Sequence, residues 1–318
     1  MKFIKFLLFS VIFISCKSKN DNVPTIAFVD AFEDNTIAKA KQGFFDALKK
    51  DGFSEEQQTI NVIYRNAQGN IPTLTQIIQY AKSEKVSLIA TCPSISTITA
   101  IQNIKDIPVF MMVSPKPELM KINAVDGRSP TNLYGVGEDL SYIDTSFGLI
   151  PKLLSKKEKI KVGMIFNQSE PQSVDALNRI KTLAQQMNIE LVSLPVNSSA
   201  ETQLVTQSLL SKNIDAFFAN PDNVVFASFE TIIQACNHAK VPVFTSEAGL
   251  VARGAVAAYG ADMYAWGYQA GEQAAEYLKT KSTKDLQWQM VKKRTKVYNS
   301  KVALQFGITL DSSFESIN

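Results

Sequence analysis

The stretch SLIATCPSISTITAIQNIKDIPVF at residues 87–110 decides the fold, because its layout occurs twice in the chain. An apolar run ends in Thr91-Cys92-Pro93-Ser94, a helical stretch follows, and Ile107-Pro108-Val109-Phe110 opens the next apolar run. Residues 215–244, DAFFANPDNVVFASFETIIQACNHAKVPVF, repeat this order with Ala219-Asn220-Pro221-Asp222 and Val241-Pro242-Val243-Phe244. Strands that alternate with amphipathic helices are typical of a parallel sheet covered by helices on both faces. The sequence therefore predicts two similar α/β units.

The same alternation extends outward from both copies. The expected strands of the first half are Thr25–Val29, Ile60–Tyr64, Ser87–Thr91 and Val109–Val113, and its helices lie near Ile37–Lys50, Thr73–Ser83 and Ile95–Ile104. The expected strands of the second half are Val162–Phe166, Glu190–Leu194, Asp215–Ala219 and Val243–Thr245, and its helices lie near Ser173–Met187, Glu201–Leu210 and Val224–Ala239. A tail adds strand Ala255–Tyr259, helix Met263–Leu278, strand Gln289–Val297 and helix Lys301–Phe306.

These elements predict an α/β fold with two doubly wound parallel-sheet lobes joined by a multi-stranded hinge. A chain of 318 residues has the length of about two domains. The tail is able to cross between the lobes. We expect an N-terminal lobe of residues 24–135 plus about 262–287, and a C-terminal lobe of residues 136–261 plus about 288–318.

The first fifteen residues have the pattern of an export signal. Two lysines in Met1–Lys5 precede the apolar stretch Phe6–Ile14, which is too short to span a bilayer. The following Phe13-Ile14-Ser15-Cys16 resembles the lipobox of bacterial lipoproteins. This resemblance implies a signal peptide over residues 1–15, lipidation of Cys16 and a lipidated tether over residues 16–23. The protein would then be exported to the cell envelope and anchored on the periplasmic side by lipid. A plain signal peptide is the alternative.

Composition argues against several classes of function. The chain has 33 basic and 30 acidic residues, a net charge of +3, so no field of one sign indicates nucleic acid. One histidine and three cysteines argue against a metal site, and Cys92 and Cys236 are expected as free thiols in different lobes. No phosphate loop, complete dinucleotide fingerprint or nucleophile elbow occurs in the sequence. We therefore expect neither an enzyme nor a cofactor; an exported glycosidase with two acids is the enzymatic alternative.

Candidate ligand-binding residues follow the expected strands, because open α/β sheets bind ligands beyond the carboxyl ends of their strands. These positions hold Phe32, Ser94, Ser114, Asn167, Ser169, Glu170, Asp222, Asn223, Ser246 and Glu247. Free N–H groups at helix N-termini suit a carboxylate, and the acidic residues suit an ammonium group, so the set fits a zwitterion. The same residue types are also ordinary helix caps, and that interpretation stays open. Aromatic residues near strand ends could stack on a ligand or pack in the core: Phe32, Phe166, Tyr259, Tyr264 and Trp266.

Several segments together resemble a known family. They are residues 40–48 (AKQGFFDAL), 66–69 (NAQG), 132–136 (NLYGV), 162–170 (VGMIFNQSE), 222–223 (DN), 241–244 (VPVF) and 254–262 (GAVAAYGAD), followed by Gly267 and Gly271. In order and spacing they are similar to the ABC-importer substrate-binding proteins of the tryptophan/tyrosine-binding type, which have the type I periplasmic binding fold. The resemblance implies two lobes that close over a small solute, which is delivered to a membrane permease, with an aromatic amino acid as the leading solute. We also expect the protein to be a monomer.

The resemblance also implies cleft residues in the matching segments: Asn167, Ser169, Glu170, Ser173, Asp222, Asn223, Ser246 and Glu247. The first half departs from the family where a ligand would lie. It has Asp34, Asn35 and Ala38 in place of a His-Pro…Asp pattern, Cys92 in place of Thr, and Pro115-Lys116 in place of Thr-Asp. An alternative function is a ligand-sensing or accessory lipoprotein of the same fold that signals to a membrane receptor.

Overall fold

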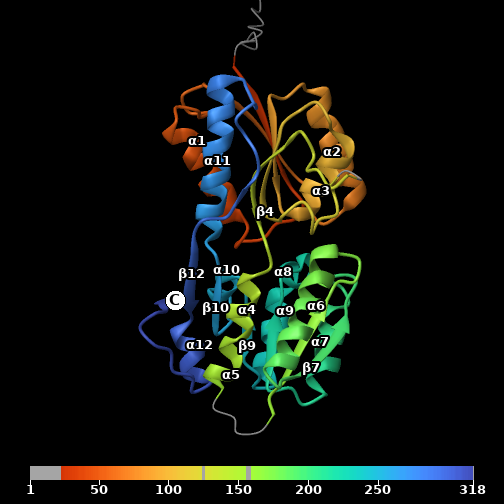
Figure 1. Ribbon diagram of the computed structural model, residues 1–318, viewed down its shortest axis with the longest axis vertical. Coiled ribbons are helices and arrows are strands. Elements are labelled where there is room, and N and C mark those ends of the chain that lie inside the picture. Colours follow the sequence, from red (N-terminus) through yellow and green to blue (C-terminus); the bar gives the residue numbers. More distant parts are fainter. Residues whose placement is uncertain (1–22, 124–125, 155–158, 318) are drawn as a thin grey trace, which may run out of the picture.

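The computed structural model describes residues 23–123, 126–154 and 159–317, and it divides them into two lobes stacked along the long axis (Figure 1). The expected signal peptide, Cys16 and all of the tether except Val23 lie outside the described residues. Within the described ranges, no helix combines the length and the apolar character needed to cross a membrane.

The upper lobe in Figure 1 is built on a six-stranded sheet with the order β11-β5-β4-β3-β1-β2. Its strands are β1 (Thr25–Asp30), β2 (Asn61–Asn66), β3 (Leu88–Cys92), β4 (Val109–Pro115), β5 (Leu133–Glu138) and β11 (Gln289–Met290). All pairs between them are parallel. Helices α1 (Ala38–Lys50) and α11 (Met263–Thr280) cover one face, and α2 (Ile71–Ser83) and α3 (Ser94–Asn103) cover the other.

The lower lobe holds a four-stranded parallel sheet with the order β7-β6-β8-β9. Its strands are β6 (Lys161–Phe166), β7 (Glu190–Pro195), β8 (Ala216–Ala219) and β9 (Val243–Thr245). Its helices are α4 (Tyr142–Phe147), α5 (Leu149–Leu153), α6 (Pro171–Gln186), α7 (Thr202–Leu210), α8 (Asn223–Ala227), α9 (Phe229–His238), α10 (Ala248–Val251) and α12 (Ser300–Gln305). The prediction of two doubly wound parallel-sheet lobes is confirmed.

A smaller sheet, β10-β12-β13, continues the lower lobe beside β9. It consists of β10 (Ala257–Ala261), β12 (Arg294–Tyr298) and β13 (Glu315–Ser316). Strands β10 and β12 run antiparallel, so this part departs from the all-parallel pattern. The backbone N–H of Val256 donates to the carbonyl of Val243 at 2.7 Å and joins the two sheets.

The chain crosses between the lobes after β5, after β10 and after β11. The single expected strand Gln289–Val297 is therefore wrong: β11 pairs with β5 in the upper sheet, and β12 pairs with β10 in the lower one. Because β5 extends to Glu138 and β11 belongs to the upper sheet, we propose lobe boundaries near residues 138 and 291 instead of 135 and 287. The expected helix Val224–Ala239 is also two helices, α8 and α9, which meet at Ser228.

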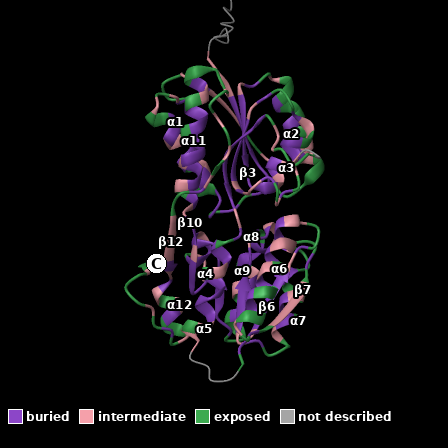
Figure 2. Cartoon of the chain, in the orientation of Figure 1, coloured by how far each residue is buried: buried purple, intermediate pink, exposed green. Residues whose placement is uncertain are grey.

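Buried residues make up the central strands of both sheets (Figure 2), and α11 packs against α1 in the upper lobe. A Cβ atom on Gly267 would lie 1.8 Å from the carbonyl oxygen of Ala40, and one on Gly271 would lie 2.4 Å from that of Phe44. Only glycine permits this approach, and the contact fixes the start of α11 near the gap between the lobes. Among the described residues, Cys92 and Cys236 are buried, unpaired and in different lobes, as expected.

Candidate functional site

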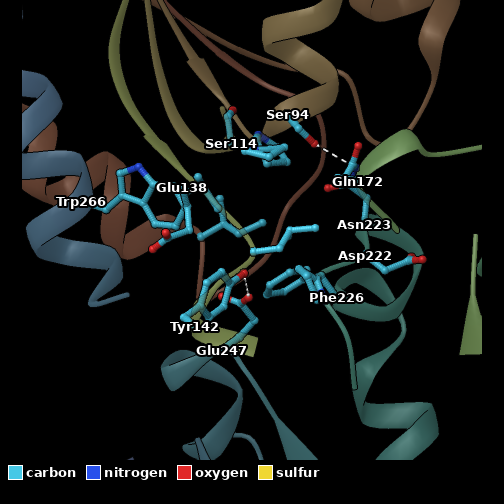
Figure 3. Close-up of a pocket in the computed structure, with 16 residues that line it drawn as sticks. Ser94, Ser114, Glu138, Tyr142, Gln172, Asp222, Asn223, Phe226, Glu247 and Trp266 are labelled. Atoms are coloured by element: carbon cyan, nitrogen blue, oxygen red, sulfur yellow. Dashed lines mark hydrogen bonds between the residues drawn. The ribbon is translucent and has the colours of Figure 1, made fainter. Parts of the chain in front are cut away.

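An inner cavity of about 50 Å³ lies between the lobes, near the crossing segments. Figure 3 shows Ser94 and Ser114 above it, Tyr142 and Glu247 below it, and Trp266 with Glu138 on one side. Gln172, Asp222 and Asn223 lie on the opposite side, with Phe226 near them. Both lobes thus supply polar and aromatic side chains to one small space. Among the described residues, none of its lining residues is Lys, Arg or His.

An outer cavity of about 380 Å³ also has walls from both lobes. Phe32, which follows β1, lines it from the upper lobe. The turn between β6 and α6 lines it from the lower lobe with Asn167, Ser169 and Glu170. Asn223 lines both cavities, so the two spaces share a wall.

The sequence-predicted residues are therefore divided between the two cavities. Ser94, Ser114, Asp222, Asn223 and Glu247 line the inner one, and Phe32, Asn167, Ser169, Glu170 and Asn223 line the outer one. Ser173 and Ser246 are fully buried and line neither; each donates a hydrogen bond to a neighbouring carboxylate instead.

Of the five aromatic candidates, Trp266 lines the inner cavity and Phe32 the outer one. Trp266 is held by a hydrogen bond from its Nε1 to the carbonyl of Val136 at 2.8 Å. Phe166 and Tyr259 pack against the core of the lower lobe. Tyr264 is exposed, and its hydroxyl donates to Asp46 at 3.0 Å. The core-packing interpretation thus applies to Phe166 and Tyr259.

Glu247 is a buried carboxylate in the wall of the inner cavity. It occupies the N-cap position of α10, two residues after the end of β9, without a capping hydrogen bond from its side chain, and the hydroxyl of Tyr142 donates to its Oε1 at 2.7 Å (Figure 3). Ser246 Oγ donates to the same oxygen at 3.3 Å. Burial raises the pKa of Glu247 to about 6, so the group is mostly ionised at neutral pH. Among the described residues both side-chain donors reach Oε1, which leaves Oε2 for a donor on a bound molecule.

Asp222 is held almost entirely by its own lobe. Its Oδ1 accepts from the backbone N–H groups of Val224 and Val225 at 2.8 and 3.1 Å, which caps α8. Its Oδ2 accepts from the N–H of Asn167 at 2.6 Å and from the hydroxyl of Ser173 at 2.5 Å. Although burial raises its pKa, these four donors occupy both oxygens. Asp222 therefore organises the strand ends more than it offers a free oxygen to the cavity.

A polar network joins the lobes between the two cavities. Ser94 Oγ, in the upper lobe, accepts from Gln172 Nε2 at 3.2 Å and from Asn223 Nδ2 at 3.3 Å. Glu170 accepts from both of these lower-lobe residues as well, through its Oε2. Burial and the nearby carboxylate of Asp222 raise the pKa of Glu170. The two bonds to Ser94 exist only when the lobes are together, so the described arrangement is a closed one.

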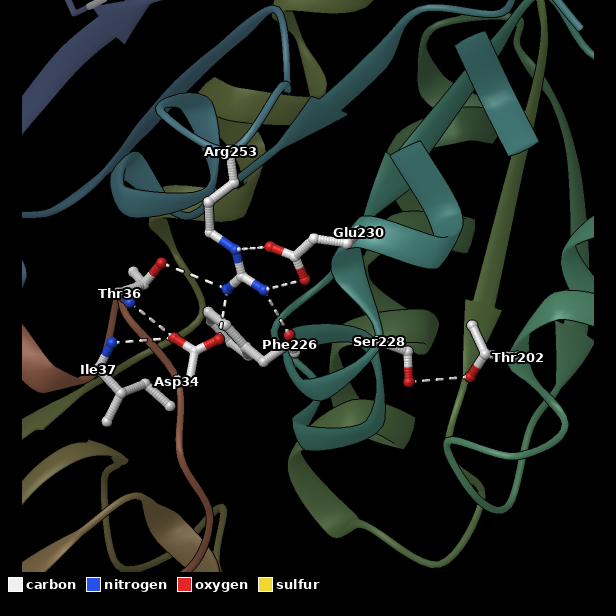
Figure 4. A network of polar contacts seen from close by, with 8 residues as sticks. All are labelled: Asp34, Thr36, Ile37, Thr202, Phe226, Ser228, Glu230 and Arg253. Carbon is white, nitrogen blue, oxygen red and sulfur yellow. Dashed lines mark hydrogen bonds and ion pairs between the residues drawn. The ribbon is translucent and has the colours of Figure 1, made fainter. Parts of the chain in front are cut away.

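Arg253 forms a second link between the lobes (Figure 4). Its guanidinium group pairs with Asp34 of the upper lobe and, within the lower lobe, with both carboxylate oxygens of Glu230 at 2.8 Å. It also donates to the carbonyl of Phe226 at 3.1 Å. Asp34 accepts from the backbone N–H groups of Thr36 and Ile37 at 2.9 and 3.0 Å, which fixes its position.

Sequence reasoning did not identify Gln172, Tyr142, Glu138 or Arg253 as site residues. Gln172 had a weak signal, because it follows Pro171 at a helix start directly after the predicted strand-end residue Glu170. Glu138 lies at the end of a strand that was not predicted, and Arg294 pairs with both of its oxygens at 3.0 and 2.5 Å. Across the part of the chain that the structure describes, no cluster of His, Cys, Asp and Glu could hold a metal ion.

The buried acids make stability depend on pH. Glu170 has a raised pKa of about 8 in the folded protein, against an ordinary value of 4.5. Between these values the folded state keeps a proton that the unfolded state has lost, so stability falls as the pH rises from about 4.5 to 8. We expect a lower unfolding temperature at pH 8 than at pH 6, with Glu170 contributing on the order of 1–2 kcal/mol. Thermal unfolding by circular dichroism measures this difference.

The variant Glu170→Gln should reduce that pH 6 to pH 8 difference, whereas Glu276→Gln on the exposed face of α11 should leave it unchanged. An identical difference in Glu170→Gln and wild type would show that Glu170 loses its proton below pH 6.

Comparisons with known proteins agree with this architecture. A family described as ABC transporter substrate binding protein matches residues 25–316. A tyrosine-binding protein of Clostridioides difficile (strain R20291) is 31% identical over 271 residues, which cover 85% of this chain and 77% of that protein. The crystal structure of a conserved domain protein from Vibrio cholerae has a TM-score of 0.84 at 27% identity and covers 92% of this chain and 99% of that one.

A further solved structure is an ABC domain in complex with L-Trp from Streptococcus pneumonia. Its TM-score is 0.81 and it covers 92% of this chain and 97% of that one, but at 20% identity it supports the fold alone. The family match over nearly the whole described chain, together with two sheets that close over a lined cavity, leads to one conclusion. The chain belongs to the ABC transporter substrate-binding protein family, whose members bind solutes and are not enzymes.

Proposed function

We propose that this protein captures a small zwitterionic solute, with an aromatic amino acid as the first choice, in the inner cavity between its lobes, which widens from about 50 Å³ to admit the solute. The observation that carries the proposal is the buried Glu247, whose Oε2 is left for a donor such as a solute ammonium group. Trp266 and Phe226 supply apolar and aromatic wall to the same cavity, as an aromatic side chain requires. The tyrosine-binding relative supports this choice of solute.

Recognition of the solute carboxylate falls to neutral donors, because no cationic side chain lines the inner cavity in the described part of the chain. Ser94 begins α3, a ten-residue helix whose first N–H groups and dipole favour an anion. Ser114 lies at the end of β4, but its hydroxyl is used within its own lobe, since it donates to the carbonyl of Met112 at 3.1 Å and bonds to Thr97 at 3.0 Å. Glu247 on the lower lobe thus suits the ammonium end of a zwitterion, and the start of α3 on the upper lobe suits its carboxylate end.

Binding would be coupled to closure of the lobes. Separating them breaks the contacts of Ser94 with Gln172 and Asn223 and the pair of Asp34 with Arg253. A solute that contacts both walls adds contacts only to the closed form and shifts the population toward it. We further propose that the protein works as a monomer, held at the cell envelope by lipid on Cys16, and delivers the solute to an ABC permease.

A thermal-shift screen of the purified full-length protein tests the proposal with amino acids, nucleosides, sugars and short peptides. A ligand at 100 times its Kd stabilises the protein by about 2.7 kcal/mol, which raises Tm by several degrees. We expect the shift with L-tyrosine or L-tryptophan. Pro115 lines the cavity at one of the positions that depart from the family pattern, so a shift with another solute would show a changed specificity. No shift with any compound would contradict the proposal.

A further inference from the structure

Gln172 stands out among the residues that line the inner cavity, because half of its amide group has no partner. The residue is 5% exposed, and its Oε1 is buried without a hydrogen-bond partner among the described residues. A buried acceptor left unpaired costs about as much as a lost hydrogen bond, and such groups are rare in native proteins. We therefore expect Gln172 Oε1 to accept a hydrogen bond from a bound molecule.

The other half of the amide is fully used. Nε2 donates to Glu170 Oε2 at 2.7 Å within the lower lobe and to Ser94 Oγ at 3.2 Å in the upper lobe. Glu170 Oε2 also accepts from the backbone N–H and the side-chain amide of Asn223, so three donors meet at this oxygen and the proton that Glu170 keeps below its pKa of about 8 belongs on Oε1. The group of Gln172 that faces it is consequently the NH2, and this fixes which end of the amide is the oxygen.

We propose that Gln172 accepts a hydrogen bond from the solute ammonium group through Oε1 while its Nε2 holds Ser94 of the opposite lobe. This inference rests on the proposed function. One amide group would then connect solute recognition to lobe closure. The solute ammonium group donates to the unpaired Oε1 while Nε2 donates to Ser94 of the upper lobe (Figure 3). Gln172 becomes a specificity-determining residue for solutes that carry an N–H donor, and the hydroxyl of Ser94 acts on closure.

The two roles can be separated with two probes, L-tyrosine and 3-(4-hydroxyphenyl)propionate, which lacks the amino group. Calorimetry gives the Kd of each probe. The Kd of 3-(4-hydroxyphenyl)propionate divided by the Kd of L-tyrosine measures how strongly the protein selects for the ammonium group. We expect Gln172→Met to reduce this ratio by about tenfold or more, since a hydrogen bond to a charged donor is lost. Ser94→Ala should weaken both probes by the same factor and leave the ratio unchanged.

Gln185→Met on the exposed side of the same helix is the matched control and should change neither Kd. Circular dichroism checks that each variant folds. If Gln172→Met does not fold, Gln172→Asn decides, because it keeps the amide but withdraws it by one methylene and should also lower the ratio. An unchanged ratio in the folded Gln172 variant overturns this inference alone. A wild-type protein that binds neither probe overturns the solute proposed above, and this inference with it.

Discussion

Asp222→Ala is expected to destabilise the protein by about 3–5 kcal/mol and to abolish solute binding as a consequence. The substitution removes the acceptor of four hydrogen bonds. It leaves the N–H groups of Val224 and Val225 without their partner, and the N–H of Asn167 keeps only its longer bond to Ser173 Oγ at 3.2 Å. Each buried donor left unpaired costs about 1–3 kcal/mol. Because Asp222 ties the end of β6 to the start of α8, the wall of the inner cavity would lose its shape. Thermal unfolding measures the loss of stability, and titration calorimetry measures the loss of solute binding.

Asn70→Ala is the matched control for this prediction. Asn70 caps α2 by accepting from the N–H of Thr73 at 2.8 Å, but it does so at the surface, and its side chain bonds to no other element in the described part of the chain. Its replacement should cost about 1 kcal/mol. If Asp222→Ala unfolds at the same temperature as Asn70→Ala and nevertheless fails to bind solute, Asp222 contacts the solute directly and its structural role is smaller than argued above.

The second large effect is expected for Arg253→Met, which breaks the charged link between the lobes. Asp34 then stays buried in the closed form without its cation, and removing one partner of a buried pair typically costs 3–5 kcal/mol. Opening the lobes returns Asp34 to water, so the cost falls on the closed form. We expect solute affinity to drop about 100-fold. Small-angle scattering should show a larger radius of gyration before solute is added.

Arg179→Met provides the control for Arg253. Arg179 also pairs with an aspartate, Asp144, but both residues belong to the lower lobe and both are partly exposed. Surface pairs of this kind contribute about 0–1 kcal/mol, so affinity and radius of gyration should stay at their wild-type values. Equal affinities for Arg253→Met and Arg179→Met would show that the pair with Asp34 does not stabilise the closed form.

Much of the fold could be predicted from local pattern, because the repeated strand–proline–helix layout of residues 87–110 and 215–244 is visible in the sequence. Strand β5 was missed because Leu-Tyr-Gly-Val-Gly-Glu lacks the β-branched run of a buried strand. Gly135 is required there for a reason that only the structure gives: it has φ +90°, and a Cβ atom would lie 2.3 Å from the carbonyl oxygen of Met111. The split of residues 289–297 between two sheets likewise depends on pairing with distant strands.

The candidate site was harder to predict than the fold. Residues that follow strands, such as Ser94 and Glu247, could be identified because position at a strand end is a local property. Their partners could not, because Gln172 is 78 residues from Ser94, Tyr142 is 105 residues from Glu247, and Arg253 is 219 residues from Asp34. The same residue types also serve as helix caps and as cavity walls, so the sequence does not distinguish the two roles. Only the hydrogen bonds separate Asp222, whose oxygens are occupied, from Glu247, which keeps one for a solute.

The most direct test of the central claim is a crystal structure of the protein grown with L-tyrosine. The account predicts the amino acid in the inner cavity, with its ammonium group near Gln172 Oε1 and Glu247 Oε2, its carboxylate toward the start of α3, and its ring against Trp266 or Phe226. Ligand density in the outer cavity, with the inner cavity free of solute, would contradict it.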